Sequence, residues 1–337
     1  MSADEGRDAG GRVGPYLQVM RVDHWFKNVF VLPGVLLGLA LSPAGLAHLR
    51  LAHVAAALLA TCLVASSNYT INEFLDAPFD RRHPVKHSRP AARGLLDRRW
   101  VIVQWLLLAS LGIGLAWLVH PYVAASAAWL WLMGIVYNVR PLRSKELPYL
   151  DVLSEAVNNP IRLFIGWFTV EATRFPPLSL AIAYWMVGAF FMATKRFAEY
   201  RRIADPATAA AYRGSFRHYD ERRLLVSLFF YAQLSALFTG VFIVRYHLEL
   251  ILAIPLLAGF LAWYLSIGLQ RDSAAQNPEK LYRERGFVAY AAVCVLLLVA
   301  LLFTRIPWLY DAFKVPQNAV TPLWVLEDPR LDGSAEP

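Results

Sequence analysis

Residues 52–72 read AHVAAALLATCLVASSNYTIN, and they run directly into the charged stretch NEFLDAPFDRRHPVKHSRP at residues 72–90. The first stretch is almost wholly apolar, and its length of about 20 residues is what a helix needs to cross the hydrocarbon core of a bilayer. The second stretch places acids and then bases at the end of that helix. Together they predict a membrane protein whose charged chemistry is gathered at one membrane surface.

The composition of the whole chain favours the same class. Of the 337 residues, 57% are hydrophobic and 17% are charged, whereas soluble domains carry about 45–50% apolar and about 25% charged residues. The formal net charge of +8 favours contact with membrane lipids that are anionic, or with an anionic substrate. No nucleic acid is expected as a partner, because the basic residues lie in short loops between apolar segments.

The apolar segments predict an all-α fold, a polytopic membrane protein with a nine-transmembrane-helix bundle. Residues 1–20 are expected to form a polar N-terminal tail, and residues 306–337 a C-terminal tail after the last span. The predicted spans are 29–47, 52–72, 100–119, 121–138, 150–170, 178–197, 224–245, 248–268 and 286–304.

The basic residues predict the orientation. Short and long connections alternate along the chain, so all long connections lie on one side, and this side holds 26 of the 33 Lys and Arg residues. Since loops rich in Lys and Arg stay in the cytoplasm, we expect a multi-pass protein of the inner (plasma) membrane. Its N-terminus and active site would face the cytoplasm, and residues 306–337 would be extracytoplasmic.

A first motif consists of Asn72, Asp76 and Asp80, spaced at i, i+4 and i+8. Successive members drift by only about 40° around a helix, so all three share one face if the helix continues past Asn72. Hard oxygen ligands on one face suit Mg²⁺, with Mn²⁺ as the alternative. Lys86 and Arg89 follow in a basic run of the kind that binds phosphate.

A second motif, Asp151, Glu155 and Asn159, repeats this spacing. The segment Asn158-Asn159-Pro160 is expected to open the helix locally. Arg162 follows inside a predicted span, where an Arg costs about 2.5–3.5 kcal/mol on insertion scales. It is therefore a functional candidate, with a satisfied interhelical ion pair as the alternative.

Other polar residues cluster on the same predicted side. Lys27 and Asn28 precede the first span, and Tyr137, Arg140 and Lys145 lie before the second motif. Lys195 and Arg196 end the sixth predicted span, with Glu199 one turn beyond Lys195. That spacing fits an ordinary i, i+4 ion pair equally well.

These motifs resemble the UbiA superfamily of intramembrane prenyltransferases, and within it the polyprenyl-phosphate phosphoribosyltransferases of the decaprenyl-phosphate type. The similarity covers about residues 20–305. RVDHWFKN at residues 21–28 resembles RPxxWxKN, residues 72–94 resemble NDxxDxxxDRxHPxKxxRPxAxG, and KRFAE at residues 195–199 resembles KRYAE. The chain departs from the family at Glu73, where Asp is usual, and in its second motif, which lacks a full Asp triplet.

The resemblance implies a UbiA-type catalytic domain over residues 21–305 and an Mg²⁺ cofactor. Asp76, Asp80 and Asp151 would be catalytic. The metal ligands would be Asn72, Asp76, Asp80, Asp151 and Glu155. The expected substrate-binding residues are Lys27, Asn28, Lys86, Arg89, Tyr137, Arg140, Lys145, Arg162, Lys195 and Arg196.

The implied activity is transfer of a 5-phosphoribosyl group from phosphoribosyl diphosphate to a polyprenyl phosphate. The alternative is a prenyltransferase that moves a polyprenyl chain from its diphosphate to an aromatic acceptor. A lipid-phosphate carrier without enzymatic activity is less expected, because the charged motifs gather on one side only. The expected partners are a polyprenyl lipid, phosphoribosyl diphosphate and membrane lipids, and homo-oligomerisation stays open.

The charge distribution makes a prediction about topology. A single cysteine introduced within residues 204–220 should react with a membrane-impermeant maleimide only from the cytoplasmic side. One introduced within residues 320–335 should react only from outside, because the positive-inside rule separates these segments. Labelling of intact cells and of inverted vesicles measures both, and the reversed pattern would refute the charge argument.

Overall fold

The structure of the protein, a computed structural model, describes residues 13–42, 45–81, 86–203, 205–270, 273–276, 278–316 and 323–326. Regular structure in these residues is helical, apart from an isolated β-bridge between Arg174 and Val325, which confirms the all-α class. The chain divides into two compact units. Unit 1 comprises Met1–Val35, Arg50–Lys145 and Ile161–Val170, and unit 2 comprises Leu36–Leu49, Glu146–Pro160 and Glu171–Pro337.

Within the described residues, seven helices are long and apolar enough to cross a membrane. The prediction of a polytopic membrane protein is therefore confirmed, whereas the count of nine stays a prediction. The helix α5 (Pro121–Asn138) has 18 residues but is not among the seven. The seven are Val13–Leu41, Leu51–Asp80, Arg98–Val119, Leu178–Ile203, Glu221–Tyr246, Leu248–Gly268 and Arg285–Leu302.

Two predicted spans have different boundaries in the structure. The predicted span 29–47 ends early, because α2 (Leu32–Leu41) stops one residue before Ser42-Pro43. The predicted span 150–170 is divided into α6 (Leu150–Ala156) and α7 (Asn158–Val170). Pro160 has no N–H to donate to the carbonyl of Ala156, so the helix is interrupted where the Asn-Asn-Pro segment predicts.

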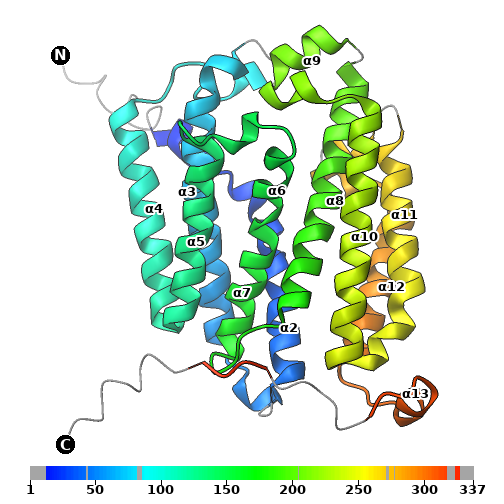
Figure 1. Cartoon of the computed structure of the whole chain (residues 1–337). Helices are drawn as coiled ribbons and strands as arrows, with labels where there is room; N and C mark the ends of the chain where they lie inside the picture. The colour runs from blue at the N-terminus through cyan, green and yellow to red at the C-terminus, as the bar shows by residue number, and fades with distance from the viewer. Residues whose placement is uncertain are drawn as a thin grey trace, which may run out of the picture. The chain divides into compact units, whose positions relative to one another are not determined.

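Unit 1 is built around α3 (Leu51–Asp80), which packs against α4 (Arg98–Val119) and α5 (Figure 1). The turn between α4 and α5 is as tight as predicted, since His120 alone separates them. Its Nδ1 accepts a hydrogen bond from the Tyr122 N–H at 3.2 Å. Large apolar side chains of α4 such as Leu107 and Leu118 are exposed, as expected for a surface that faces lipid.

A second contact in unit 1 joins two helices through glycines. A Cβ atom added to Gly34 would lie 2.0 Å from the Leu163 carbonyl oxygen of α7. A Cβ atom added to Gly166 would lie 2.0 Å from the Val31 carbonyl oxygen at the end of η1 (Val22–Val31). Small residues allow backbones to approach this closely in membrane bundles, so both positions require glycine.

Unit 2 is built around α8 (Leu178–Ile203) and α10 (Glu221–Tyr246), whose mutual packing is extensive. The helices α11 (Ile254–Gly268) and α12 (Arg285–Leu302) pack on one another. At one end of α8 and α10, the connection holds α9 (Pro206–Tyr212) and η5 (Gly214–His218). At the other end lie η6 (Leu248–Ala253) and α13 (Pro307–Ala312).

The close backbone contacts at two glycines predict that alanine destabilises the protein at these positions and not at a glycine without such contacts. Gly34→Ala and Gly166→Ala should each destabilise the protein by about 1–3 kcal/mol, because the added methyl meets rigid backbone. Gly114→Ala in α4 is the matched control, since a Cβ atom there meets nothing within 4 Å. It should be neutral or stabilising by about 0.5–1 kcal/mol. Thermal unfolding in detergent measures all three, and equal shifts would contradict the close approach.

Candidate active site

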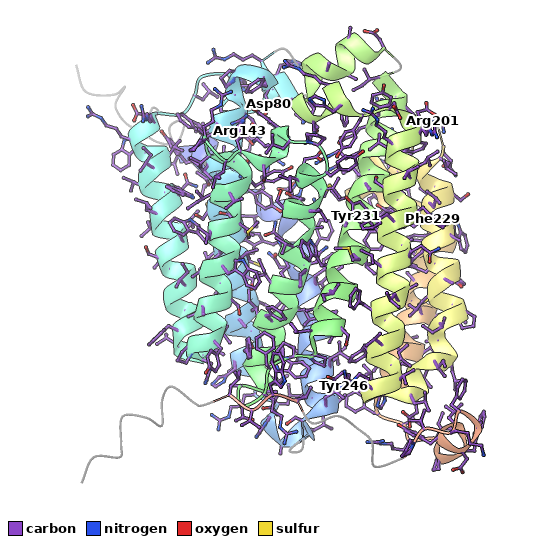
Figure 2. The ribbon with its side chains drawn as sticks, viewed as in Figure 1. Asp80, Arg143, Arg201, Phe229, Tyr231 and Tyr246 are labelled. Carbon is purple, nitrogen blue, oxygen red and sulfur yellow. The ribbon has the colours of Figure 1, made fainter. Side chains whose placement is uncertain are left out.

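The first motif lies at the end of α3 in unit 1. The helix continues through Pro78 to Asp80, so Asn72, Asp76 and Asp80 share one face as predicted. Figure 2 shows Asp80 and Arg143 at the same end of this unit. The motif is therefore a polar surface that extends a membrane-crossing helix.

Asp76 binds two cations through a single oxygen. Lys145 Nζ lies 2.6 Å and Arg143 NH2 3.0 Å from Asp76 Oδ1. Both cations are buried, with exposed fractions of 6% for Lys145 and 7% for Arg143. Among the described residues, no side chain of this site donates a hydrogen bond to Oδ2 of Asp76. The cluster thus brings two buried cations to one oxygen of a partly exposed carboxylate.

Asn138, at the end of α5, organises this cluster. Its Nδ2 donates to the Gly134 carbonyl at 2.9 Å, which directs its Oδ1 toward Lys145 Nζ at 2.9 Å and toward Asn72 Nδ2. Because the Nδ2 group of Asn72 is used in this bond, its Oδ1 is the atom left for a ligand. Arg143 NH1 also donates to the Asn138 backbone carbonyl at 3.2 Å.

Arg89 has a protein partner in the structure. Its NH1 lies 2.6 Å from Oδ2 of Asp80, a carboxylate that is only 5% exposed. This ion pair ties the loop after α3 back to the helix end. Lys86, in the same loop, is half-buried. His83 and Pro84, which belong to the motif resemblance, lie outside the described residues.

Asn28 joins three segments of unit 1. Arg162 Nε of α7 donates to Asn28 Oδ1 at 3.0 Å, and Asn28 Nδ2 donates to Cys62 Sγ of α3 at 3.2 Å. Arg162 is thus held by an interhelical hydrogen bond to an amide in addition to its other contacts. Lys27 lies 2.6 Å from His24 Nδ1.

Tyr137 and Arg140 are the remaining predicted substrate-binding residues near the Asp76 cluster. Lys145 Nζ lies 5.8 Å from the ring centre of Tyr137, a cation–π contact. Arg140 is exposed and precedes a cis peptide bond to Pro141.

The second motif lies in unit 2, where Asp151 is fully buried. Its Oδ2 accepts from Arg196 Nε and Ser215 Oγ, each at 3.1 Å, and its Oδ1 accepts from the Tyr219 hydroxyl at 2.7 Å. Three protein donors therefore occupy both oxygens. This environment favours a structural anchor over the predicted metal ligand.

Tyr219 is held in turn by the backbone. Its hydroxyl accepts from the Tyr149 N–H at 2.5 Å. Burial, together with the charge of Asp151, raises the pKa of the Tyr219 phenol. The phenol therefore stays neutral and donates to the carboxylate.

The other residues of the second motif are distributed differently. Asn159 lies in α7, beyond the interruption, whereas Glu155 lies in α6 with Asp151. Glu155 is half-buried and belongs, with Glu199, to the charged surroundings of Lys195. Glu199 pairs at 3.1 Å with Arg196, three residues before it in the chain.

The side-chain oxygens of Asn72 and Asp76 in unit 1 fit a divalent cation better than the oxygens of Asp151 do. Asn72 and Asp76 offer hard oxygens at a partly open position, and Mg²⁺ usually takes one or two carboxylates while phosphate oxygens and water complete its shell. Among the described residues, no three His, Cys, Asp or Glu side chains come together as a metal cage.

Sequence reasoning missed Asn138, Arg143, Ser215 and Tyr219 as site residues. Arg143 lies in the same loop as the predicted residues Arg140 and Lys145. The sequence does not show that Arg143 is buried. Tyr219 is 68 positions from Asp151, and no spacing rule connects them.

This geometry defines a class of protein. It is an integral-membrane helical protein in which one helix end carries Asn and Asp side chains next to buried cations. The profile of the UbiA prenyltransferase family matches residues 31–290, and the chain belongs to this family.

Two enzyme names occur among the proteins to which the chain is similar. A decaprenyl-phosphate phosphoribosyltransferase from Corynebacterium glutamicum is 28% identical over 60% of this chain and 59% of its own length. The enzyme of the same name from Mycolicibacterium smegmatis is 29% identical over 63% of this chain and 64% of its own. The chain thus spans less than two thirds of these relatives. A protoheme IX farnesyltransferase from Sodalis glossinidius is 27% identical over 81% and 88%.

Solved structures agree on the fold. A UbiA homologue from Archaeoglobus fulgidus bound to DMAPP and Mg²⁺ aligns with a TM-score of 0.65 at 19% identity, over 87% of this chain and all of that one. A digeranylgeranylglyceryl phosphate synthase aligns with a TM-score of 0.59 at 12% identity, over 87% of this chain and 99% of that one.

The Asp151 cluster makes a prediction about stability. Tyr219→Phe should destabilise the protein by about 1–3 kcal/mol, because Asp151 and the Tyr149 N–H each lose a partner. The raised pKa means that this contribution is complete below pH ~10 and declines as pH rises above ~10. Thermal unfolding of both proteins at pH 8 and above pH 10 measures it. Tyr282→Phe is the control, since Tyr282 is 66% exposed, and an equal effect there would contradict the anchor.

Proposed function

We propose that this protein is an Mg²⁺-dependent integral-membrane transferase that moves a 5-phosphoribosyl group from phosphoribosyl diphosphate to a polyprenyl phosphate. The observation that carries the proposal is the pair of buried cations, Arg143 and Lys145, that meet at one oxygen of Asp76. Cations that converge at one position can offer charge-assisted hydrogen bonds to the oxygens of a phosphate group. The names of the relatives from Corynebacterium and Mycolicibacterium support a phosphoribosyl donor.

In this proposal the leaving diphosphate is held by Lys145 and Arg143, whose positions are fixed by Asp76 and Asn138. An oxygen of the lipid phosphate attacks the anomeric carbon of ribose, and the bond from this carbon to the diphosphate oxygen breaks. Fixed cations stabilise the charge that develops on the leaving group. Mg²⁺, held by Asn72 and Asp76, would neutralise further diphosphate charge.

The remaining predicted residues have proposed roles of the same kind. Asp80 positions Arg89, and Lys86 contacts the donor diphosphate. Residues 21–305 would form the catalytic domain in the plasma membrane, with its charged motifs facing the cytoplasm. The remaining assignments of substrate contact are Lys27, Asn28, Tyr137, Arg140, Arg162, Lys195 and Arg196.

Prenyl transfer to an aromatic acceptor is the second candidate. The farnesyltransferase relative aligns over more of the chain than the phosphoribosyltransferases do, and this coverage favours it. Purified protein with radiolabelled phosphoribosyl diphosphate and a polyprenyl phosphate separates the two. Label that moves into the lipid phase supports our proposal. Its absence, together with turnover of a prenyl diphosphate and an aromatic acid, would select the alternative.

The Asp76 cluster generates a prediction about activity. Asp76→Asn should abolish turnover, because the variant loses a charged oxygen ligand and releases two cations from their positions. Chelation should have the same effect, with rescue by Mg²⁺ or Mn²⁺ and not by Zn²⁺, since the ligands are hard oxygens. Asp23→Asn is the control, because its side chain is 77% exposed. Turnover in Asp76→Asn would refute the metal assignment.

A second prediction separates the cations by substrate. Lys86→Ala should weaken the binding of both phosphoribosyl diphosphate and free diphosphate. Lys195→Ala should weaken the binding of phosphoribosyl diphosphate only, because this ligand carries the additional 5-phosphate. A charged phosphate contact contributes about 1.5–3 kcal/mol, which is roughly ten- to a hundred-fold in affinity. Calorimetry in detergent with both ligands and both variants measures this. Equal losses of the two ligands in Lys195→Ala would favour prenyl transfer.

A further inference from the structure

Unit 2 contains a cavity of about 250 Å³ at the end opposite the Asp151 cluster. Tyr219 lies just before α10, and the cavity includes His247, which directly follows it. A helix of 26 residues is about 39 Å long, so the two sites lie at opposite membrane surfaces. Figure 2 shows Arg201 and Tyr246 at these two ends of unit 2.

One wall of the cavity is apolar. It is lined by Leu39 and Leu46 from the segment around α2, and by Leu302 and Phe303 at the end of α12. Leu46 is 65% and Phe303 50% exposed, so the wall continues to the outer surface of unit 2. A lipid hydrocarbon chain can reach it from the membrane.

The other wall offers hydrogen-bond donors. Ser42 is only 8% exposed, and among the described residues its hydroxyl has no hydrogen-bond partner. Arg305 is exposed and uses one N–H, which donates to the Tyr310 hydroxyl at 3.3 Å. A guanidinium has five N–H groups in a planar fork that matches phosphate oxygens, so Arg305 retains donors for an anion.

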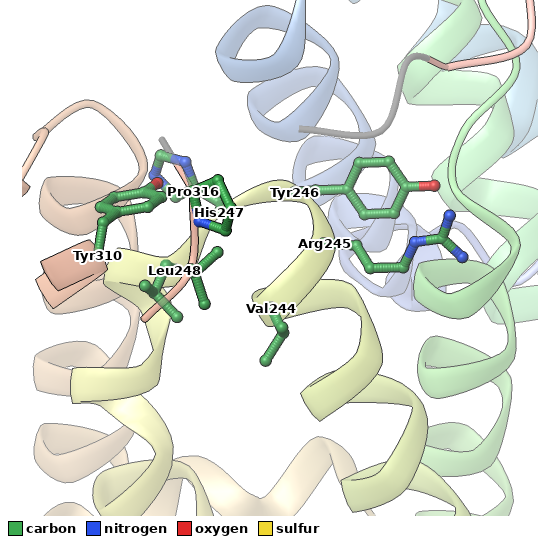
Figure 3. Close-up of a pocket in the computed structure, with 8 residues that line it drawn as sticks. Val244, Arg245, Tyr246, His247, Leu248, Tyr310 and Pro316 are labelled. Carbon is green, nitrogen blue, oxygen red and sulfur yellow. The ribbon is translucent and has the colours of Figure 1, made fainter. Parts of the chain in front are cut away.

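The base of the cavity is fixed by a buried network. Tyr310 donates to Oε2 of the fully buried Glu249 at 3.1 Å, and Oε1 of Glu249 accepts from the Ile306 N–H at 3.1 Å. His247 Nε2 donates to the Leu301 carbonyl at 2.8 Å, while its Nδ1 lies 3.6 Å from Glu249. Figure 3 shows His247 and Tyr310 on the same side of the turn, with Arg245 and Tyr246 directed away.

This network fixes the direction of Arg305. Burial beside Glu249 raises the pKa of the Tyr310 phenol, which therefore stays protonated and keeps donating to the carboxylate. Its oxygen lone pairs then remain available to the guanidinium of Arg305. Glu249 does not line the cavity, and both of its oxygens accept hydrogen bonds, from the Ile306 N–H and the Tyr310 hydroxyl.

We propose that this cavity binds an anionic glycerophospholipid of the adjoining leaflet. Arg305 and Ser42 bind the phosphate, and the wall formed by Leu39, Leu302 and Phe303 holds the upper part of one acyl chain. Charge complementarity selects the headgroup, and the apolar wall distinguishes a lipid from free phosphate. The site is separate from phosphoribosyl transfer and does not depend on it.

Native mass spectrometry of the full chain in detergent with phosphatidylglycerol tests the proposal. The wild type should retain phosphatidylglycerol in preference to phosphatidylcholine, and Arg305→Gln should lose about tenfold in its affinity. Arg245→Gln is the matched control, since Arg245 is also exposed, lies two residues before His247 and does not line this cavity. It should retain the lipid. Ala40→Trp, which fills the cavity, should abolish retention with unchanged thermal unfolding.

Three results would overturn the proposal. In the first, Arg305→Gln retains phosphatidylglycerol like the wild type. In the second, Arg245→Gln loses as much affinity for phosphatidylglycerol as Arg305→Gln does, which would indicate a non-specific effect of surface charge. Inorganic phosphate at the lipid's concentration could displace it, which would indicate a free-phosphate site. Binding is read without turnover, so these results are independent of the transferase assay.

Discussion

The ion pair between Lys145 and Asp76 is the interaction on which the candidate active site depends. It joins the loop after α5 to the end of α3, and Arg143 and Asn138 complete the same cluster. Both cations are buried, and they meet at a single oxygen of a partly exposed carboxylate. The pair is therefore a structural link between the loop and the helix, and in our proposal it also positions Lys145 for a phosphate group.

The two oxygen motifs have different environments despite their equal spacing. At the first motif, Asp76 is partly exposed and one of its oxygens is directed toward protein cations. At the second, Asp151 is enclosed by Arg196, Ser215 and Tyr219. A carboxylate whose oxygens accept from three protein donors is suited to positioning its neighbours.

Unit 2 has polar networks at both ends of the same helices. The Asp151 network closes the end of α8 and α10 that carries Arg196, and the Glu249 network closes the end that carries His247. Each contains a buried carboxylate that accepts from a tyrosine hydroxyl. Because such groups are costly to bury without partners, each network fixes the loops around it and determines which side chains remain available to ligands.

The sequence by itself determined the all-helical membrane class, the tight turn at His120, the interruption before Pro160 and the shared face of Asn72, Asp76 and Asp80. Each follows from local rules, namely apolar length, proline chemistry and the helical period. Only the tertiary structure decided that Arg143 and Lys145 bind the same oxygen of Asp76, and that Tyr219 encloses Asp151. These contacts join residues 67 to 69 positions apart in the first case and 68 in the second. Burial and pairing at such separations depend on how helices pack, and periodicity along one helix carries no information about it.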